Sequence, residues 1–247
     1  MIADELRARI LSGELRDGDE FSKQDELISE FGVSKPSLRE ALRILETEGL
    51  LTVRRGNVGG SVVHVPKRAS ITYRLALVLQ VRGVSLADAG EALRQLEPVA
   101  AALCARRDDR ATTVLPGLRQ AHEDMQRAID NDDEMATIQS SRLFHELVVE
   151  SCGNETIRIV VGAIEGLWSA HEQAWVREAT LRGAFPEKPM PERCLAEHGE
   201  IVELIESGDI DGAAAACRRH LESVQEFPLQ TPARPIDATS MRSRYSD

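Results

Sequence analysis

The chain has 247 residues, a formal net charge of −11 and four cysteines. This length is enough for two domains that each bury their own core. The cysteines form no CxxC pair and no apolar run reaches the roughly 18 residues of a membrane span, which excludes a disulfide scaffold and a membrane-spanning protein and favours a cytoplasmic one.

The charge is unevenly distributed along the chain. Residues 1–32 carry a net charge of −5 and residues 33–68 a net charge of +4, so that residues 69–247 carry −10 of the total of −11. A basic segment in an acidic chain is typical of a protein that contacts phosphates with one surface and repels them with the rest.

The first residues predict three short helices. Apolar spacing predicts amphipathic helices over residues 2–11 and 23–31. Ser34 is a good N-cap for the third helix, Pro36 suits its first turn, and Gly49 is placed to end it. Only two residues separate the second helix from Ser34, which is the short turn of a helix-turn-helix.

The third helix has two different faces. At 100° per residue, one stripe is apolar and a neighbouring stripe is cationic. The apolar stripe contains Leu38, Leu42 and Leu45. The cationic stripe contains Lys35, Arg39 and Arg43. A cationic stripe by itself is more often a solvated surface than a binding site.

A small hairpin follows the third helix. Residues 51–55 and 61–65 read as its strands, and a glycine-rich tip joins them. Arg54 and Arg55 point to opposite sides of their strand, so at most one of them faces a given groove. The short turn, the cationic helix and the hairpin together predict a winged helix-turn-helix that binds double-stranded DNA.

Residues 1–66 resemble the DNA-binding domain of the GntR family of bacterial transcription regulators. The matching segments are residues 10–15, 26–27, 31–34, 38–42, 48–51 and 55–56, together with Leu45. Asp25 departs from the family pattern, which has an arginine there that helps to hold DNA. The resemblance implies DNA contacts by the third helix and by the tip of the wing, and geometry adds Arg43. The predicted contacts are Lys35, Ser37, Arg39, Arg43, Arg55 and Gly56.

The rest of the chain predicts an all-α domain, so the fold class is mainly α. A linker is expected over 67–71, an effector-binding helical bundle over 72–227, and a disordered tail rich in proline, serine and arginine over 228–247. The expected helices lie at about 71–82, 85–107, 110–130, 132–151, 154–180, 191–207 and 209–226.

Three histidines of this domain are predicted to meet. His198 lies ten residues before the turn at Gly208, and His220 lies twelve after it, so the two side chains stand at nearly the same height of a helical hairpin. His145 faces inward on another helix. Three such imidazoles can hold zinc or a similar divalent metal, or can form a hydrogen-bonded polar pocket without one.

This domain resembles the ligand-binding domain of the FadR branch of the family. The matching segments are residues 94–101, 143–145, 152–154 and 207–213, with His198, Ile201 and His220. In relatives an acidic metal ligand stands one turn before the first histidine, where this chain has Ser141. The resemblance also implies that Arg94 pairs with a carboxylate of the effector, although Glu97 is an alternative partner. The predicted effector-binding residues are Arg94, Ser141, His145, His198 and His220.

These features predict a transcription regulator, and specifically a homodimeric repressor that binds a palindromic operator and responds to a small, carboxylate-bearing effector. An alternative is a metal-dependent enzyme or a metal sensor that uses His145, His198 and His220. The sequence has no Ser/His/Asp pattern, phosphate-binding loop or dinucleotide-binding glycine pattern, so we do not expect an enzyme.

Overall fold

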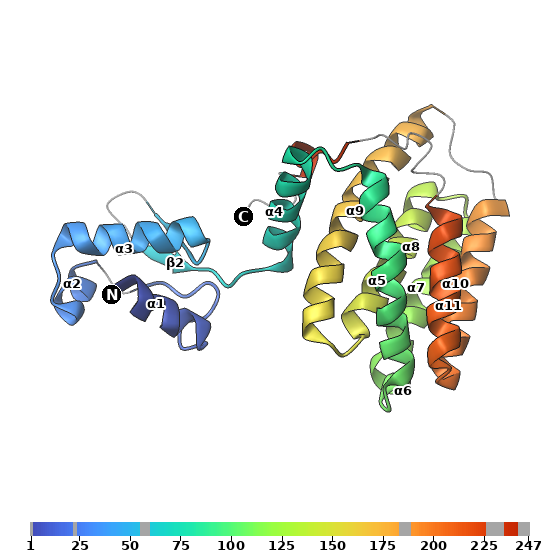
Figure 1. The fold of residues 1–247 in the computed structure, drawn as a ribbon, viewed down its shortest axis with the longest axis horizontal. Coiled ribbons are helices and arrows are strands. Elements are labelled where there is room, and N and C mark those ends of the chain that lie inside the picture. The colour runs from blue at the N-terminus through green and yellow to red at the C-terminus, as the bar shows by residue number, and fades with distance from the viewer. Residues whose placement is uncertain (1, 22–23, 55–59, 183–188, 226–234, 242–247) are drawn as a thin grey trace. The chain divides into compact units, whose positions relative to one another are not determined.

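The computed structural model describes residues 2–21, 24–54, 60–182, 189–225 and 235–241. The chain divides into two compact units, Met1–Lys67 and Arg68–Asp247. Figure 1 shows the helices and strands of both.

The first unit is a winged helix-turn-helix, as predicted. Its elements are α1 (Ile2–Leu11), α2 (Gln24–Phe31), α3 (Lys35–Glu48), β1 (Leu51–Val53) and β2 (Ser61–Val63). The two strands pair in antiparallel register, with Leu51 opposite Val63, and Glu20 adds an isolated bridge to Val62. The predicted apolar stripe of α3 is fully buried in the core of this unit.

The ends of α3 are fixed by its capping residues. The Ser34 hydroxyl accepts a hydrogen bond from the Ser37 amide, which satisfies one of the donors that a helix start leaves free. Gly49 ends the helix at a φ of 77°, a left-handed conformation that glycine adopts without strain. The helix orientation within the core is therefore set by its apolar face and by both caps.

The second unit is a helical bundle, which confirms the mainly α fold class. Its helices are α4 (Arg68–Val81), α5 (Leu86–Arg106), α6 (Arg110–Thr113), α7 (Leu115–Asp130), α8 (Glu134–Ser151), α9 (Glu155–Leu181), α10 (Pro189–Ser207) and α11 (Ile210–Val224). The helix expected over 110–130 is divided at Val114. Pro116 lacks an amide hydrogen and clashes with the preceding turn, so a new helix starts with this proline in its first turn.

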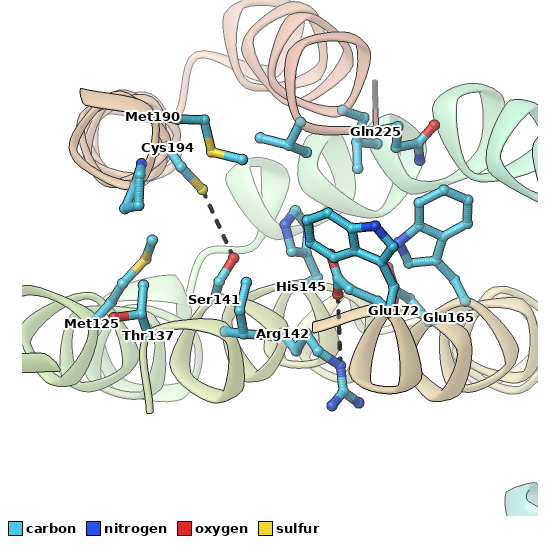
Figure 2. A pocket seen from close by; sticks show the side chains of 16 residues that line it. Met125, Thr137, Ser141, Arg142, His145, Glu165, Glu172, Met190, Cys194 and Gln225 are labelled. Carbon is cyan, nitrogen blue, oxygen red and sulfur yellow. Dashed lines mark hydrogen bonds and ion pairs between the residues drawn. The ribbon is translucent and has the colours of Figure 1, made fainter. Parts of the chain in front are cut away.

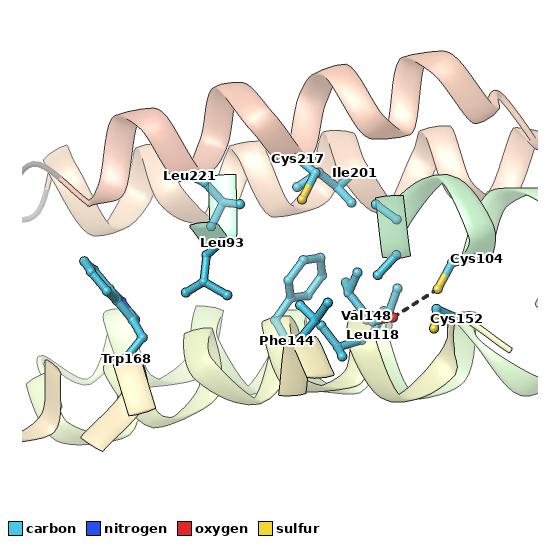
Figure 3. Close-up of a cluster of buried hydrophobic side chains, with 14 of the residues drawn as sticks. Leu93, Cys104, Leu118, Phe144, Val148, Cys152, Trp168, Ile201, Cys217 and Leu221 are labelled. Atoms are coloured by element: carbon cyan, nitrogen blue, oxygen red, sulfur yellow. Dashed lines mark hydrogen bonds between the residues drawn. The ribbon is translucent and has the colours of Figure 1, made fainter. Parts of the chain in front are cut away.

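The core of the bundle is apolar along most of its length (Figure 3). Helix α5 packs against α11 and α9, α7 packs against α8, and α10 packs against α11. Phe144, Leu93 and Leu167 are among the fully buried side chains at its centre. Within the described residues, no helix is both long enough and apolar enough to span a membrane.

Helix α4 occupies most of the segment expected to be a linker. It starts at Arg68, whereas the linker was expected over 67–71. Two contacts explain the early start: Arg68 forms an ion pair with Glu150, and the Thr72 hydroxyl donates to the Arg68 carbonyl. Thr72 and Ala76 are buried on the side that packs against α9. Residues 68–71 are therefore part of the bundle.

Part of the tail expected to be disordered is also ordered. Ile236, Ala238 and Met241 are fully buried, and residues 239–241 form a short 3₁₀ helix. The Asp237 amide donates to His171 Nε2 at 3.0 Å, and the Ala238 amide donates to Gln80 Oε1 at 2.9 Å. Apolar side chains and satisfied amides hold residues 235–241 against the bundle, while residues 226–234 and 242–247 lie outside the described part.

Candidate functional site

The exposed face of α3 carries positive charge with no ion-pair partner in the described part of the chain. Lys35, Ser37, Arg39 and Arg43 are all exposed. Among the described residues, no carboxylate forms an ion pair with the three cations of this set. On neighbouring elements the arginines are paired, since Arg7 binds Glu48 at 2.7 Å and Arg9 binds Glu30 at 2.7 Å. The α3 cations are therefore available to an anionic partner.

The described part of the wing contains fewer unpaired cations than the sequence predicts. Arg54 forms an ion pair with Glu20 at 2.7 Å, so its charge is already matched within the protein. Arg55 and Gly56, the predicted contacts at the wing tip, lie outside the described residues. Of the predicted DNA contacts, those on α3 lie within the described residues.

The predicted convergence of the three histidines is present. His145 comes from α8, His198 from α10 and His220 from α11, and all three are buried. The Nε2 atom of His220 lies 3.0 Å from that of His198 and 3.2 Å from that of His145. Three ring nitrogens from three helices therefore meet at one point in the core.

Neighbouring side chains fix the orientation of these rings. His145 Nδ1 lies 2.6 Å from Glu97 Oε1, and His220 Nδ1 lies 2.8 Å from Glu197 Oε2. The ring of Phe144 stacks on His198 at 4.0 Å. Each carboxylate holds one nitrogen of its imidazole, so the other nitrogen points to the common centre.

The buried carboxylates and imidazoles shift one another's pKa values. Burial alone would lower the pKa of His145, but the charge of Glu97 and its hydrogen bond raise it to about 9. Burial and the neighbouring imidazoles hold the pKa of His198 well below its usual range, and burial lowers that of His220. Burial and the charge of Glu97 raise the pKa of Glu165 well above the usual carboxyl range. These directions favour neutral His198 and His220, the state that binds metals, whereas His145 has to release its proton before it can bind one.

This arrangement fits a divalent metal. Two nitrogens that each lie about 2.0–2.1 Å from a tetrahedral zinc are separated by about 3.3 Å, close to the observed 3.0 and 3.2 Å. His145, His198 and His220 form a group of buried ligand atoms that all lie within 4.8 Å of one another. Carboxylates on the far nitrogens of metal-binding histidines are also a recurring feature of such sites.

A cavity borders the histidine cluster on the side of His145 (Figure 2). Its empty space, including the part at the mouth that is open to solvent, is about 740 Å³. Polar groups and two tryptophans line it. The lining residues are Met125, Thr137, Ile138, Ser141, Arg142, His145, Glu165, Trp168, Glu172, Trp175, Met190, Pro191, Cys194, Leu221, Val224 and Gln225.

Arg142 is the arginine of this cavity. Its Nε is buried and has no hydrogen-bond partner among the described residues. Glu172 Oε2 is the carboxylate atom facing it, at 3.8 Å, which is too long for a hydrogen bond. Glu172 and Glu146, at 3.8 and 3.9 Å, partly balance the guanidinium charge, and a buried Nε without a hydrogen bond is costly enough to favour an anionic ligand.

The predicted effector residues divide into two groups. Ser141 and His145 line the cavity, whereas His198 and His220 lie behind it in the histidine cluster. Arg94 is absent from the lining: it forms an ion pair with Glu91 and donates to Gln225 Oε1 at 2.5 Å. The alternative partner, Glu97, is not bound to Arg94 either, because it faces His145.

Sequence reasoning missed the residues that support the site from other helices. Glu97 was considered only as a neighbour of Arg94, and Glu197, Arg142 and Cys194 were not considered at all. One signal was available: Cys194 precedes His198 by four residues, as Ser141 precedes His145. The contact from Glu97 to His145 spans 48 residues and could be found only from the packing of α5 on α8.

Comparison with known proteins gives matches to both parts of the chain. A family profile described as "Bacterial regulatory proteins, gntR family" matches residues 1–60, and one described as "FCD domain" matches residues 88–223. The second match alone covers more than half of the chain.

Similar proteins span nearly the whole chain. The transcriptional regulator Mce2R of Mycobacterium tuberculosis is 28% identical, with 90% of this chain and 87% of that protein covered. LutR of Bacillus subtilis is 25% identical, with 88% and 94% covered. A Streptococcus agalactiae structure titled GntR has the same fold, with a TM-score of 0.68, 24% identity, and 92% and 98% of the two chains covered.

Proposed function

Since this chain belongs to the GntR family of bacterial regulatory proteins and carries an FCD domain, it is a DNA-binding transcription regulator, and we propose that it is a homodimeric repressor whose operator affinity is set by a metabolite in the helical unit. The family assignment favours a regulator over the metal-dependent enzyme. A regulator of bacterial operators acts in the cytoplasm, where the chromosome is.

The observation that carries the DNA-binding mode is the unpaired cationic stripe of α3. Lys35, Arg39 and Arg43 are exposed on the second helix of a helix-turn-helix and have no ion-pair partner among the described residues. Such a helix enters the major groove, where arginine can bind the O6 and N7 atoms of guanine with two hydrogen bonds. In this mode Arg39 reads a base, while Lys35 and the wing bind phosphates.

The proposed metal is a divalent ion such as zinc, held by His145, His198 and His220. When bound, it supplies a cross-link between the helices that carry these residues and adds to the stability of the bundle. Glu97 and Glu197 orient two of the ligands through their Nδ1 atoms.

The proposed effector occupies the adjacent cavity and carries a carboxylate. Arg142 is the candidate to receive that carboxylate, because it lines the cavity and its buried Nε has no hydrogen-bond partner among the described residues. Arg94, the residue expected from the resemblance, contributes through Gln225, which lines the cavity. Binding alters operator affinity only if the effector binds the two DNA-binding states unequally. A metal sensor that needs no metabolite is the alternative that the histidine cluster supports.

The DNA-binding mode is tested by selecting duplexes from a random library with wild-type protein and with Arg39→Ala. Wild type should enrich a symmetric motif, and Arg39→Ala should lose at least one position of each half-site. Arg106→Ala removes the same charge from an exposed site in the other unit and should leave the motif unchanged. An unaltered motif with Arg39→Ala would exclude base recognition by this residue.

A further inference from the structure

The three histidines alone provide no negatively charged ligand for the proposed metal. Neutral imidazoles contribute none, and Ser141, one turn before His145 on α8, offers only a hydroxyl. Structural zinc sites are usually closed by four protein ligands, and a thiolate is the strongest of these donors for zinc. A fourth ligand therefore has to be sought close to the cluster.

Cys194 on α10 precedes His198 by four residues, just as Ser141 on α8 precedes His145. It precedes His198 by one helical turn, so both side chains leave the same face of the helix. The Cys194 Sγ atom lies 3.9 Å from His198 Nε2 and 3.8 Å from Ser141 Oγ. Figure 2 shows Cys194 and Ser141 facing each other across the cavity.

One of these distances is near that of a shared metal. With zinc bonds of about 2.3 Å to sulfur and 2.0–2.1 Å to nitrogen, tetrahedral geometry separates the two ligand atoms by about 3.6 Å. Cys194 Sγ lies 3.9 Å from His198 Nε2, but it stands outside the group of ligand atoms within 4.8 Å of one another that the three histidines form. Metal binding therefore requires the cysteine side chain to rotate toward His145 and His220, and among the described residues only weak sulfur contacts to Ser141 and His198 oppose that rotation.

The surroundings of Cys194 suit a ligand that is protected from water. The residue is 6% exposed and packs with Met125, Ile129 and Leu195. Cys152 is also buried, at 3% exposed, but its Sγ contacts the Asn154 carbonyl at 3.6 Å. The chain therefore offers a matched cysteine for comparison.

We propose that Cys194 is the fourth ligand of a Cys/His₃ metal site formed with His145, His198 and His220. This inference rests on the proposed metal. As the sulfur–metal bond forms, the thiol releases its proton to solvent and the thiolate supplies the missing negative charge. A site with four protein ligands is closed, so the effector binds beside the metal, at Arg142, and not on it.

Cobalt(II) is the probe for the test, since it occupies zinc sites and a cobalt–thiolate bond gives a charge-transfer band in the near ultraviolet. Purified full-length protein is stripped with chelator and titrated with cobalt. Wild type and Cys152→Ser should both show this band with one cobalt per chain. Cys194→Ser should lose the band, and its zinc affinity, measured against a chromophoric chelator, should fall by at least about 100-fold.

A second variant separates ligand loss from misfolding. Ser141→Asp combined with Cys194→Ser places a carboxylate one turn before His145, so it should recover at least about tenfold in zinc affinity without recovering the band. Cobalt binding by wild type without a thiolate band, or an unchanged affinity of Cys194→Ser, overturns the role of Cys194 while the histidine site stands. No cobalt or zinc binding by wild type overturns both the metal and its fourth ligand.

Discussion

Glu97 is a fully buried carboxylate held by the His145 imidazole and, more weakly, by the Cys217 thiol. Its Oε1 faces His145 Nδ1 at 2.6 Å, and its Oε2 has no partner among the described residues. Burying a carboxylate is costly, and a cationic neighbour reduces that cost. A divalent metal on His145 would provide such a charge, and without a metal a protonated His145 provides it, since Glu97 raises the pKa of that imidazole to about 9.

We therefore predict that Glu97→Gln weakens zinc binding by about 10–100-fold, the usual effect of losing a carboxylate behind a metal-binding histidine. The amide still fills the space, so the bundle should remain folded by circular dichroism. Competition with a chromophoric chelator measures the affinity. Glu200→Gln changes an exposed carboxylate paired with Arg219 and should have no effect. Equal affinities for the two variants would refute the role of Glu97.

Lys35 and Arg39 should differ in what they contribute to DNA binding. A lysine that contacts a phosphate adds affinity for any sequence and releases a counterion. Lys35→Ala should weaken binding to specific and random duplexes by a similar factor, and should reduce the slope of log affinity against log salt by about one. Titrations at several salt concentrations measure this slope. A loss confined to the specific duplex would instead assign base recognition to Lys35.

At the level of residues, sequence spacing predicts which side chains share a helix face but not most contacts between helices. The exposure of Lys35, Arg39 and Arg43 follows from their spacing alone. The meeting of His198 and His220 also follows from spacing, because the two residues lie at similar distances from the turn that joins their helices. The partner of Arg94 did not follow, because Glu91 and Gln225 compete with Glu97 for it and only packing decides. Arg142 was missed for the same reason.

At the level of elements, the ordered segment 235–241 is the largest departure from expectation. Its composition resembles a disordered tail, but three small or apolar side chains are fully buried, and backbone amides bind Gln80 and His171. The hydrogen bond from the Ile236 amide to the Val84 carbonyl, at 3.5 Å, ties the segment to the turn between α4 and α5. Composition averages over a whole tail and cannot detect a seven-residue contact.

This segment should stabilise the helical unit. We predict that Ile236→Ala lowers its free energy of unfolding by about 2 kcal/mol, the lower end for emptying a buried isoleucine site, since a short segment outside the helices can adjust. Urea titration followed by tryptophan fluorescence reports on this unit, because both tryptophans lie in α9. Ile210→Ala makes the same change at a position that is 39% exposed and should cost much less. Equal losses would mean that residues 235–241 do not support the fold.

For the whole molecule, the distribution of charge assigns different tasks to the two units. The stretch from 33 to 68 is positive in a chain of net charge −11, and the helical unit is acidic. The total charge therefore opposes DNA binding everywhere except at α3 and the wing, so that binding depends on the orientation of that surface. A ligand in the helical unit can control such binding without touching DNA, provided that it favours one arrangement of the protein.

Coupling of this kind is reciprocal, which gives a test that needs no knowledge of the effector. If bound metal stabilises the operator-binding state, stripping the metal should weaken operator binding by a factor within about 5–150, the usual range for coupled sites. Saturating operator DNA should then tighten zinc binding by the same factor, because the two changes are one coupling free energy. Fluorescence anisotropy and chelator competition measure the two sides, with His220→Ala as a control that should show neither effect. If metal removal leaves operator affinity unchanged, the histidine cluster stabilises the bundle but does not control DNA binding.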